Sequence, residues 1–305
     1  MTTFRYHIVS LLSVFLALAV GIALGGGPLS EIGRADDGSD AANAGSPRVT
    51  AQLAQARAAS GFQDEVTTGL APDAIGDAIA RRTVSIVTLP GADKEVVAGL
   101  TAAVKQGGGV LTGTYAVRPK LVAPDGKSLV DTLGAQVAES VKDADIPTTA
   151  TTYDRIGQLI GRAVATTTNA GDPTDDGSAD ILSSLRGAQL LDAAAQPTKR
   201  SSLVLVVLGK EPADDSGADN ILGGITSGIA ERADAVLVAG STASATDGVL
   251  KTLRDDETFA ASVSSVDSDQ TAAGRLVAVL ALAADMDGEP GHYGASGADG
   301  ALPQD

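Results

Sequence analysis

TVSIVTLPGADKEVVAGLTAAVKQGGGVLTGTY, residues 83–115, decides the fold class. Its first part, residues 83–89, is mostly β-branched and apolar without alternation, the pattern of a strand covered on both faces. Residues 90–93 end that strand and cap a helix predicted to run to Gln106, where three glycines stop it. Residues 110–115 then predict a second strand. A strand, a helix and a strand in this order predict a parallel, right-handed crossover and therefore an α/β fold.

The same alternation continues toward the C-terminus. The sequence predicts three helices and no clear strand in the middle of the chain, and then three more strands that alternate with helices. The predicted strands are 202–208, 235–239 and 261–266, and the predicted helices are 128–141, 152–165, 178–191, 217–232, 245–254 and 270–286. Elements of these lengths predict a mostly parallel sheet with helices on both faces.

An uncharged stretch before this domain predicts a membrane anchor. Residues 8–27, IVSLLSVFLALAVGIALGGG, are long enough as a helix to cross a bilayer's hydrocarbon. Arg5 precedes the stretch and acidic residues follow it, so the positive-inside rule places the N-terminus in the cytoplasm and the remainder outside. A cleaved signal peptide is the competing interpretation, because residues 23–25 form a small-x-small site. The predicted anchoring side chains are Ile8, Leu12, Phe15, Leu18, Ile22 and Leu24.

A short helix is predicted between the anchor and the domain. After a tether rich in Gly, Ser, Asp and Ala, apolar residues from 49 to 70 recur at three- and four-residue steps and are predicted to share one helical face. That face would pair with a partner helix, with a second copy, or with the chain's own domain. The partner-binding candidates are Val49, Leu53, Phe62, Val66 and Leu70. The predicted segments are 1–30 (cytoplasmic stub and anchor), 31–72 (tether and short helix), 73–290 (extracytoplasmic α/β domain) and 291–305 (Gly-rich tail).

Composition excludes several function classes. A net charge of −16 and a pI near 4.4 disfavour binding to nucleic acid or to anionic lipid. The chain has no cysteine, which excludes disulfides, thiolate catalysis and thiolate metal sites. The acidic run before residue 183 departs from a calcium loop, since its third position is Thr174 and its twelfth is Ser183.

No motif for an enzyme or a cofactor is present. The chain lacks GxxxxGK[ST], a GxGxxG after a strand, and the GxSxG elbow of hydrolases. Beyond His7, the single histidine is His292, so no cofactor is expected and the protein is predicted not to be an enzyme. The candidate soft-metal ligands outside the anchor are Met286 and His292, which alone cannot build a tight copper site.

The two ends of the chain resemble a known family. The opening RYHIVSLLSVFLALAVGIALG and the closing Gly291-His292-Tyr293-Gly294, after a TAAGRLVAVLALA helix, are similar to the ends of the actinobacterial MctB family of copper transport outer-membrane proteins. The resemblance implies a role in copper efflux or homeostasis in the cell envelope. A related corynebacterial member is a membrane-anchored partner in cell separation that acts through a coiled coil, which is usually longer than residues 49–70.

Two functions therefore remain open from the sequence. The first is a single-span, non-enzymatic envelope protein with the copper role that the resemblance implies. The second is a scaffold in cell division or wall remodelling that binds a partner through the 49–70 helix or through an edge of the sheet.

Overall fold

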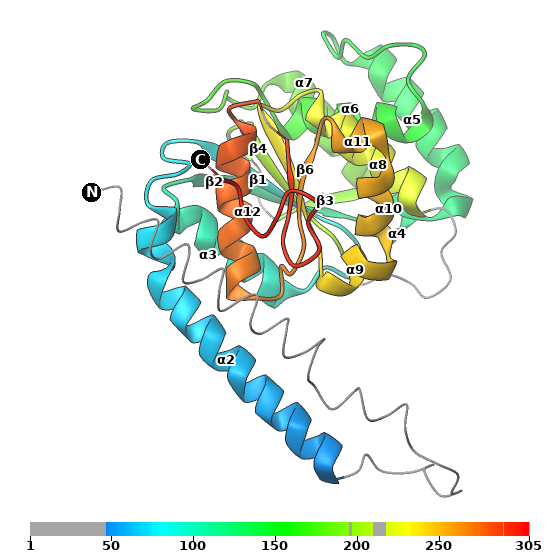
Figure 1. Ribbon diagram of the computed structural model, residues 1–305. Helices are drawn as coiled ribbons and strands as arrows, with labels where there is room; N and C mark the ends of the chain where they lie inside the picture. Colours follow the sequence, from blue (N-terminus) through cyan, green and yellow to red (C-terminus); the bar gives the residue numbers. More distant parts are fainter. Residues whose placement is uncertain (1–46, 195–196, 210–217, 289, 305) are drawn as a thin grey trace, which may run out of the picture. The chain divides into compact units, whose positions relative to one another are not determined.

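In the part of the chain that the structure describes, seven strands form one sheet (Figure 1). The computed structural model describes residues 47–194, 197–209, 218–288 and 290–304, with the backbone alone at 47, 48, 218 and 219. The strands are β1 (Thr83–Thr88), β2 (Val110–Val117), β3 (Leu191–Ala193), β4 (Leu203–Val207), β5 (Ala235–Ala239), β6 (Ser264–Val266) and β7 (His292–Tyr293). Their order in the sheet is β3-β2-β1-β4-β5-β6-β7.

Helices connect and cover these strands. They are α2 (Pro47–Ile75), α3 (Lys94–Gln106), α4 (Pro119–Val122), the 3-10 turn η3 (Pro124–Gly126), α5 (Lys127–Ser140), α6 (Thr152–Val164), α7 (Asp176–Gly187), α8 (Ala218–Ala230), α9 (Thr242–Asp247), α10 (Val249–Asp255), α11 (Glu257–Ala260) and α12 (Ala272–Asp285). The chain divides into two compact units, Met1–Ala74 and Ile75–Asp305. The second unit, which holds the whole sheet, is called the α/β domain below.

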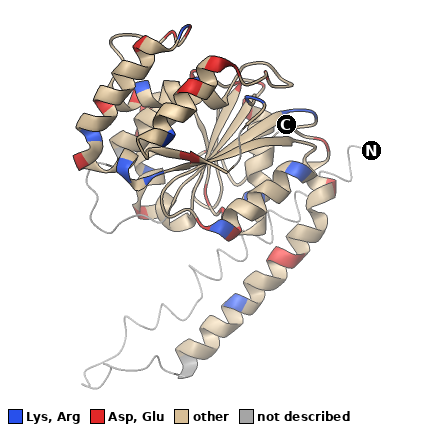
Figure 2. Cartoon of the chain, turned by 180° about the vertical axis from the view of Figure 1, so that it is seen from behind, with Lys and Arg blue, Asp and Glu red and all other residues tan. Residues whose placement is uncertain are grey.

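The sheet is mostly parallel, as the sequence predicts. Every neighbouring pair of strands is parallel except β2 with β3, which is antiparallel. All residues of β4 and of β5 are buried, because helices cover both faces and each strand is apolar throughout. Lys, Arg, Asp and Glu lie mainly on helices and loops (Figure 2). The α/β class is therefore confirmed.

The helices form two layers. Helix α12 packs against α3 on one face of the sheet, and α6 packs against α8 on the other (Figure 1). Strand order runs in the same direction from β4 to β5 and from β6 to β7, yet α8 and α12 cover opposite faces. The β6-α12-β7 connection therefore has the hand opposite to that of the β4-α8-β5 connection, which is rare among parallel crossovers.

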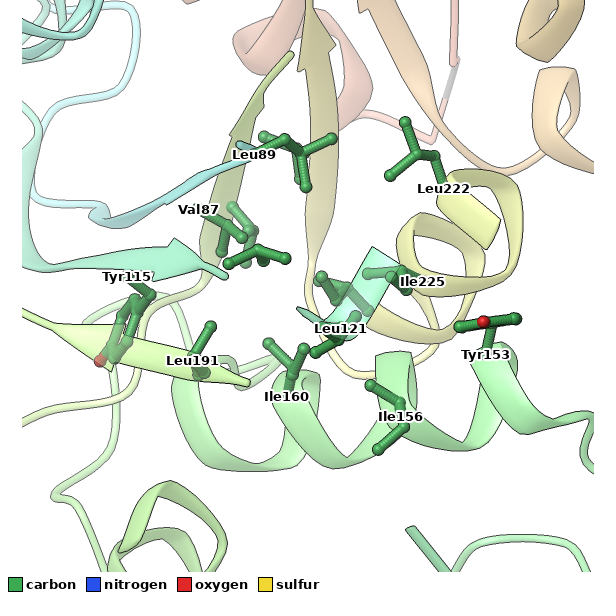
Figure 3. Packing of buried hydrophobic residues seen from close by; sticks show 14 of the residues in the cluster. Val87, Leu89, Tyr115, Leu121, Tyr153, Ile156, Ile160, Leu191, Leu222 and Ile225 are labelled. Carbon is green, nitrogen blue, oxygen red and sulfur yellow. The ribbon is translucent and has the colours of Figure 1, made fainter. Parts of the chain in front are cut away.

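Glycines bring α6 and α8 into backbone contact. A Cβ atom on Gly157 would lie 2.3 Å from the carbonyl oxygen of Ile225, and one on Gly228 would lie 2.4 Å from that of Asp154. Beside this crossing, Ile156 and Ile160 of α6 and Leu222 and Ile225 of α8 belong to one buried cluster (Figure 3). The small residues set the distance at which the larger ones can interdigitate.

Several short elements differ from the prediction. Strands β3 and β7 were not predicted, and β7 lies within the stretch interpreted as a Gly-rich tail. The predicted helix over 245–254 is two helices, α9 and α10, because Gly248 has an extended backbone between them. Helix α11, a single turn, begins where Asp256 caps it. Elements of two to four residues carry too little periodicity to be recognised in a sequence.

Candidate functional site

The partner-binding candidates lie on α2, which is a single helix longer than the predicted one. Four of the five candidates are large apolar side chains exposed to solvent, and Leu70 is half-buried. Among the described residues, only two other large hydrophobics are comparably exposed, Val110 and Leu129. The exposed fractions are 49% for Val49, 49% for Leu53, 67% for Phe62 and 44% for Val66.

The prediction that these residues share one face of α2 is wrong. Residues nine apart on an α-helix are rotated by about 180°, at about 100° per residue. Leu53 and Phe62 therefore point to opposite sides of α2. The apolar residues between them follow three steps of three residues, and each step falls about 60° short of a full turn. Val49 lies near Leu53 and Phe62 lies near Val66, so α2 carries two apolar pairs whose mean directions differ by about 140°.

The anchoring candidates lie outside the described residues. Ile8, Leu12, Phe15, Leu18, Ile22 and Leu24 all precede residue 47. Within the part of the chain that the structure describes, no helix has both the length and the apolar character needed to cross a membrane.

The candidate metal ligand His292 is built into the sheet. It lies in β7, buried, with its ring stacked on Phe259 at 6.3 Å between centroids. Its Nδ1 lies 2.9 Å from Ser265 Oγ, and Ser265 Oγ accepts from Arg254 Nε at 2.8 Å. The backbone hydrogen bond at Ala260 requires a ring N–H, which places the proton of the neutral ring on Nε2, so Nδ1 accepts from the Ser265 hydroxyl.

The environment of His292 favours its neutral form. Burial lowers its pKa, and so does the nearby Arg254, while Asp299 and the Ala260 backbone act in the opposite direction. Both ring nitrogens are engaged, so a metal ion could bind only after these hydrogen bonds break. The other candidate, Met286, is half-buried at the C-cap of α12. Among the described residues, no three His, Cys, Asp or Glu side chains are grouped as a metal site would require.

The acidic run before α7 serves the fold. Asp175 caps α7 by accepting from the Ser178 N–H at 2.8 Å, and it pairs with Arg162 at 2.9 Å. Burial acts to raise its pKa, but the bonds from Arg162 and Ser178 hold that pKa well below the usual range. The Thr166 hydroxyl donates to Asp172 and lowers its pKa as well. These partners occupy the oxygens that a calcium ion would need.

A polar cluster that the sequence did not single out lies at the carboxyl edge of the sheet. Asp267, Ser268 and Asp269 directly follow β6, and Ser268 has a φ of 66°. Burial raises the pKa of Asp269 to about 6, against a backbone hydrogen bond from Gln270 and the charge of Arg275. Three polar residues directly after a predicted strand were the available signal, since ligands of doubly wound sheets bind at this edge.

The usual ligand crevice of such a sheet is filled by main chain. The strand order reverses between β1 and β4, where ligands ordinarily bind. There a Cβ atom on Gly209, after β4, would lie only 1.7 Å from the carbonyl oxygen of Pro90, after β1. The two loops are therefore in backbone contact at the switch point.

Comparison with known proteins decides the family. The family described as "Copper transport outer membrane protein, MctB" matches residues 1–303. The chain belongs to the MctB family. Relatives named copper transporter MctB in Mycobacterium tuberculosis and Mycobacterium bovis are 27% identical, over 96% of this chain and 96% of their own. One in Mycobacterium leprae is also 27% identical, over 97% of this chain and 96% of its own.

The MctB family match extends over both units. It runs through α2 and the α/β domain as well as the residues before α2, so the match is not confined to one unit. The motif Gly291-His292-Tyr293-Gly294, which carries the resemblance at the C-terminal end, is the β7 segment of this MctB-family chain. Its histidine ring is buried and hydrogen-bonded to Ser265.

Proposed function

We propose that this chain is a non-enzymatic envelope protein, anchored by residues 8–27, that supports copper efflux or homeostasis. The match to a copper transport family over residues 1–303 carries the proposal. The family name also supports an envelope location. The anchor, with the N-terminus in the cytoplasm and the α/β domain outside, follows from the charge pattern around the apolar stretch.

Copper handling is proposed to be indirect. The chain has no cysteine, two methionines and two histidines, whereas Cu(I) selects soft sulfur and imidazole ligands. In the described part of the chain, His292 is committed to Ser265 and to the stack on Phe259. The protein would then act through an assembly or a partner that carries the metal.

A second candidate function is supported by α2. Its two apolar pairs are large hydrophobic side chains exposed to solvent. Such exposure is typical of surfaces that contact another protein. In this alternative the protein is a scaffold in cell division or wall remodelling, and α2 pairs with a partner helix or with a second copy.

An experiment on a strain that lacks the gene distinguishes the two functions. Cells lacking the gene are grown over a copper series while cell copper and cell shape are followed. Raised cell copper with copper sensitivity and normal shape supports the copper role. Normal copper tolerance with chained or misshapen cells contradicts it and supports the scaffold.

A further inference from the structure

One arginine holds the end of the chain onto the sheet. Arg254, in the last turn of α10, has a side chain only 9% exposed. It donates from Nη2 to the carbonyl oxygen of Tyr293 at 2.8 Å and from Nη1 to that of Ser296 at 3.3 Å. It also donates to Ser265 Oγ, so this one side chain joins α10, β6 and the segment after β7.

A buried aspartate, Asp267, also holds this segment. The Arg254–Asp267 pair is called the clasp below. Asp267 pairs with Arg254 at 3.1 Å and is fully buried. Its carboxylate accepts from the backbone N–H groups of Ala295 at 2.8 Å and Ser296 at 2.9 Å. A Cβ atom on Gly294 would lie 2.6 Å from this carboxylate, so a glycine is needed for the close approach. The loop after β7 is thus bound mainly through side chains of two other elements.

The backbone itself holds the segment weakly. Strand β7 pairs with β6 through two residues only, Ser265 with His292 and Val266 with Tyr293. Beyond β7, Asp299 takes the place of a neighbouring strand, because it accepts from the His292 N–H and donates its own N–H to the His292 carbonyl oxygen. The segment 291–300 is therefore a small unit at the edge of the sheet, joined to β6 by few backbone hydrogen bonds.

His292 connects this unit to its clasp. Its ring bonds to the same Ser265 hydroxyl that accepts from Arg254. The charged groups that act on the ring are Arg254 from α10 and Asp299 from the segment itself, while α11 presents the Phe259 ring and the Ala260 backbone. A second positive charge beside Arg254 would weaken the attachment.

We propose that residues 291–300 form a strap that closes on β6 through the Arg254–Asp267 clasp and opens when His292 is protonated. The pKa of His292 is lowered in the closed form, so the closed form disfavours the protonated ring, as the proposal requires. The closed strap prefers the neutral ring, so protonation below the ordinary histidine pKa of about 6.5 favours the open form.

The test uses the full-length protein, whose lack of cysteine allows site-specific spin labels. Lys251→Cys and Ala298→Cys, both exposed, place one label on α10 and one on the strap. The distance distribution measured by pulsed EPR is expected to be narrow at pH 8 and to gain a broad second population at pH 5. A control pair, Lys251→Cys with Thr258→Cys, lies outside the strap and is expected to stay unchanged.

Two variants test the trigger and the clasp. His292→Asn offers Ser265 an uncharged acceptor, so the strap is expected to stay closed at both pH values. Arg254→Met is expected to open it at pH 8. A distribution in the unsubstituted strap that is identical at pH 5 and pH 8 overturns the proposal, whether or not Arg254→Met folds. So does a pH 5 opening that persists in His292→Asn.

Discussion

Single residues decide how the α/β domain responds to pH, and Asp285 is the clearest case. It is the last residue of α12, is buried, and among the described residues nothing hydrogen-bonds its Oδ2. Burial raises its pKa to about 6, against hydrogen bonds from Ser264 and the Val236 backbone. Asp234 adds a like charge nearby.

Asp285→Asn is expected to change the pH dependence of stability. Between about pH 4 and pH 6 the folded state binds more protons at Asp285 than the unfolded state, so ionisation costs the unsubstituted protein up to about 3 kcal/mol as pH rises. The variant lacks this loss. Its free energy of unfolding relative to the unsubstituted protein should therefore increase from pH 4 to pH 8, as measured by urea unfolding. The exposed Asp287→Asn is the control, and parallel curves for Asp285→Asn would contradict the expectation.

Met286→Leu tests whether the sulfur of Met286 is needed for copper tolerance. Leucine keeps the volume of the half-buried methionine but removes its sulfur, so packing should change by less than about 1.5 kcal/mol. In the deletion strain, the variant is expected to restore copper tolerance fully. Loss of tolerance with a normal amount of protein in the membrane would make Met286 a ligand.

Residue roles could be predicted only where they depend on local sequence. The cap of α3 by Asp93 was expected, because an aspartate between a strand and a helix is a local signal. The network around His292 joins Arg254, Ser265 and Asp267 from two other elements. No spacing in the sequence reveals that these residues meet.

At the level of elements, α2 differs most from its prediction. It continues through Ser60 and Gly61 and contains Pro72 in its last turns. Its two apolar pairs point about 140° apart, so contact through both pairs requires two neighbouring helices or one that wraps around α2.

Charge substitutions on α2 test whether these pairs matter. Leu53→Glu places a carboxylate in one apolar pair, and Phe62→Glu places one in the other. Thr68→Glu adds the same charge at an exposed position outside both pairs. If α2 binds a partner, the first two variants are expected to fail to correct a cell-separation defect that Thr68→Glu corrects. Equal complementation by all three would count against the scaffold.

The α6-α8 crossing gives a second test of an element. Gly157→Ala would drive a methyl group against the Ile225 carbonyl, and forcing the helices apart should cost about 2–4 kcal/mol. Gly187→Ala is the matched control, because a Cβ there meets nothing within 4 Å. Thermal unfolding should show a lower Tm for the first variant alone. Unchanged stability of Gly157→Ala would contradict the close contact.

The long strands were predictable and the short ones were not. Strands β4 and β5 are continuous apolar runs and β1 is mostly apolar or β-branched, and nearly all their residues are buried, as expected in a covered parallel sheet. Strand β7 has two residues and follows a crossover of the less common hand, so neither its composition nor its topology could be anticipated.

At the scale of the molecule, the α/β domain has its own core. The cluster of buried hydrophobics that covers one face of the sheet lies entirely between Val87 and Val263. A chain beginning at Ile75 is therefore expected to fold and to unfold cooperatively on heating. A molten or aggregated product would show that residues 1–74 are needed for folding.

The two edges of the sheet bear on how copies of the α/β domain would meet. Strand β3 has three residues, and the outward N–H and carbonyl groups of His292 in β7 are both taken by Asp299. A neighbouring molecule therefore finds no long row of open hydrogen-bonding groups on which to add a strand. Copies of the α/β domain are therefore not expected to join one another by strand addition at these edges.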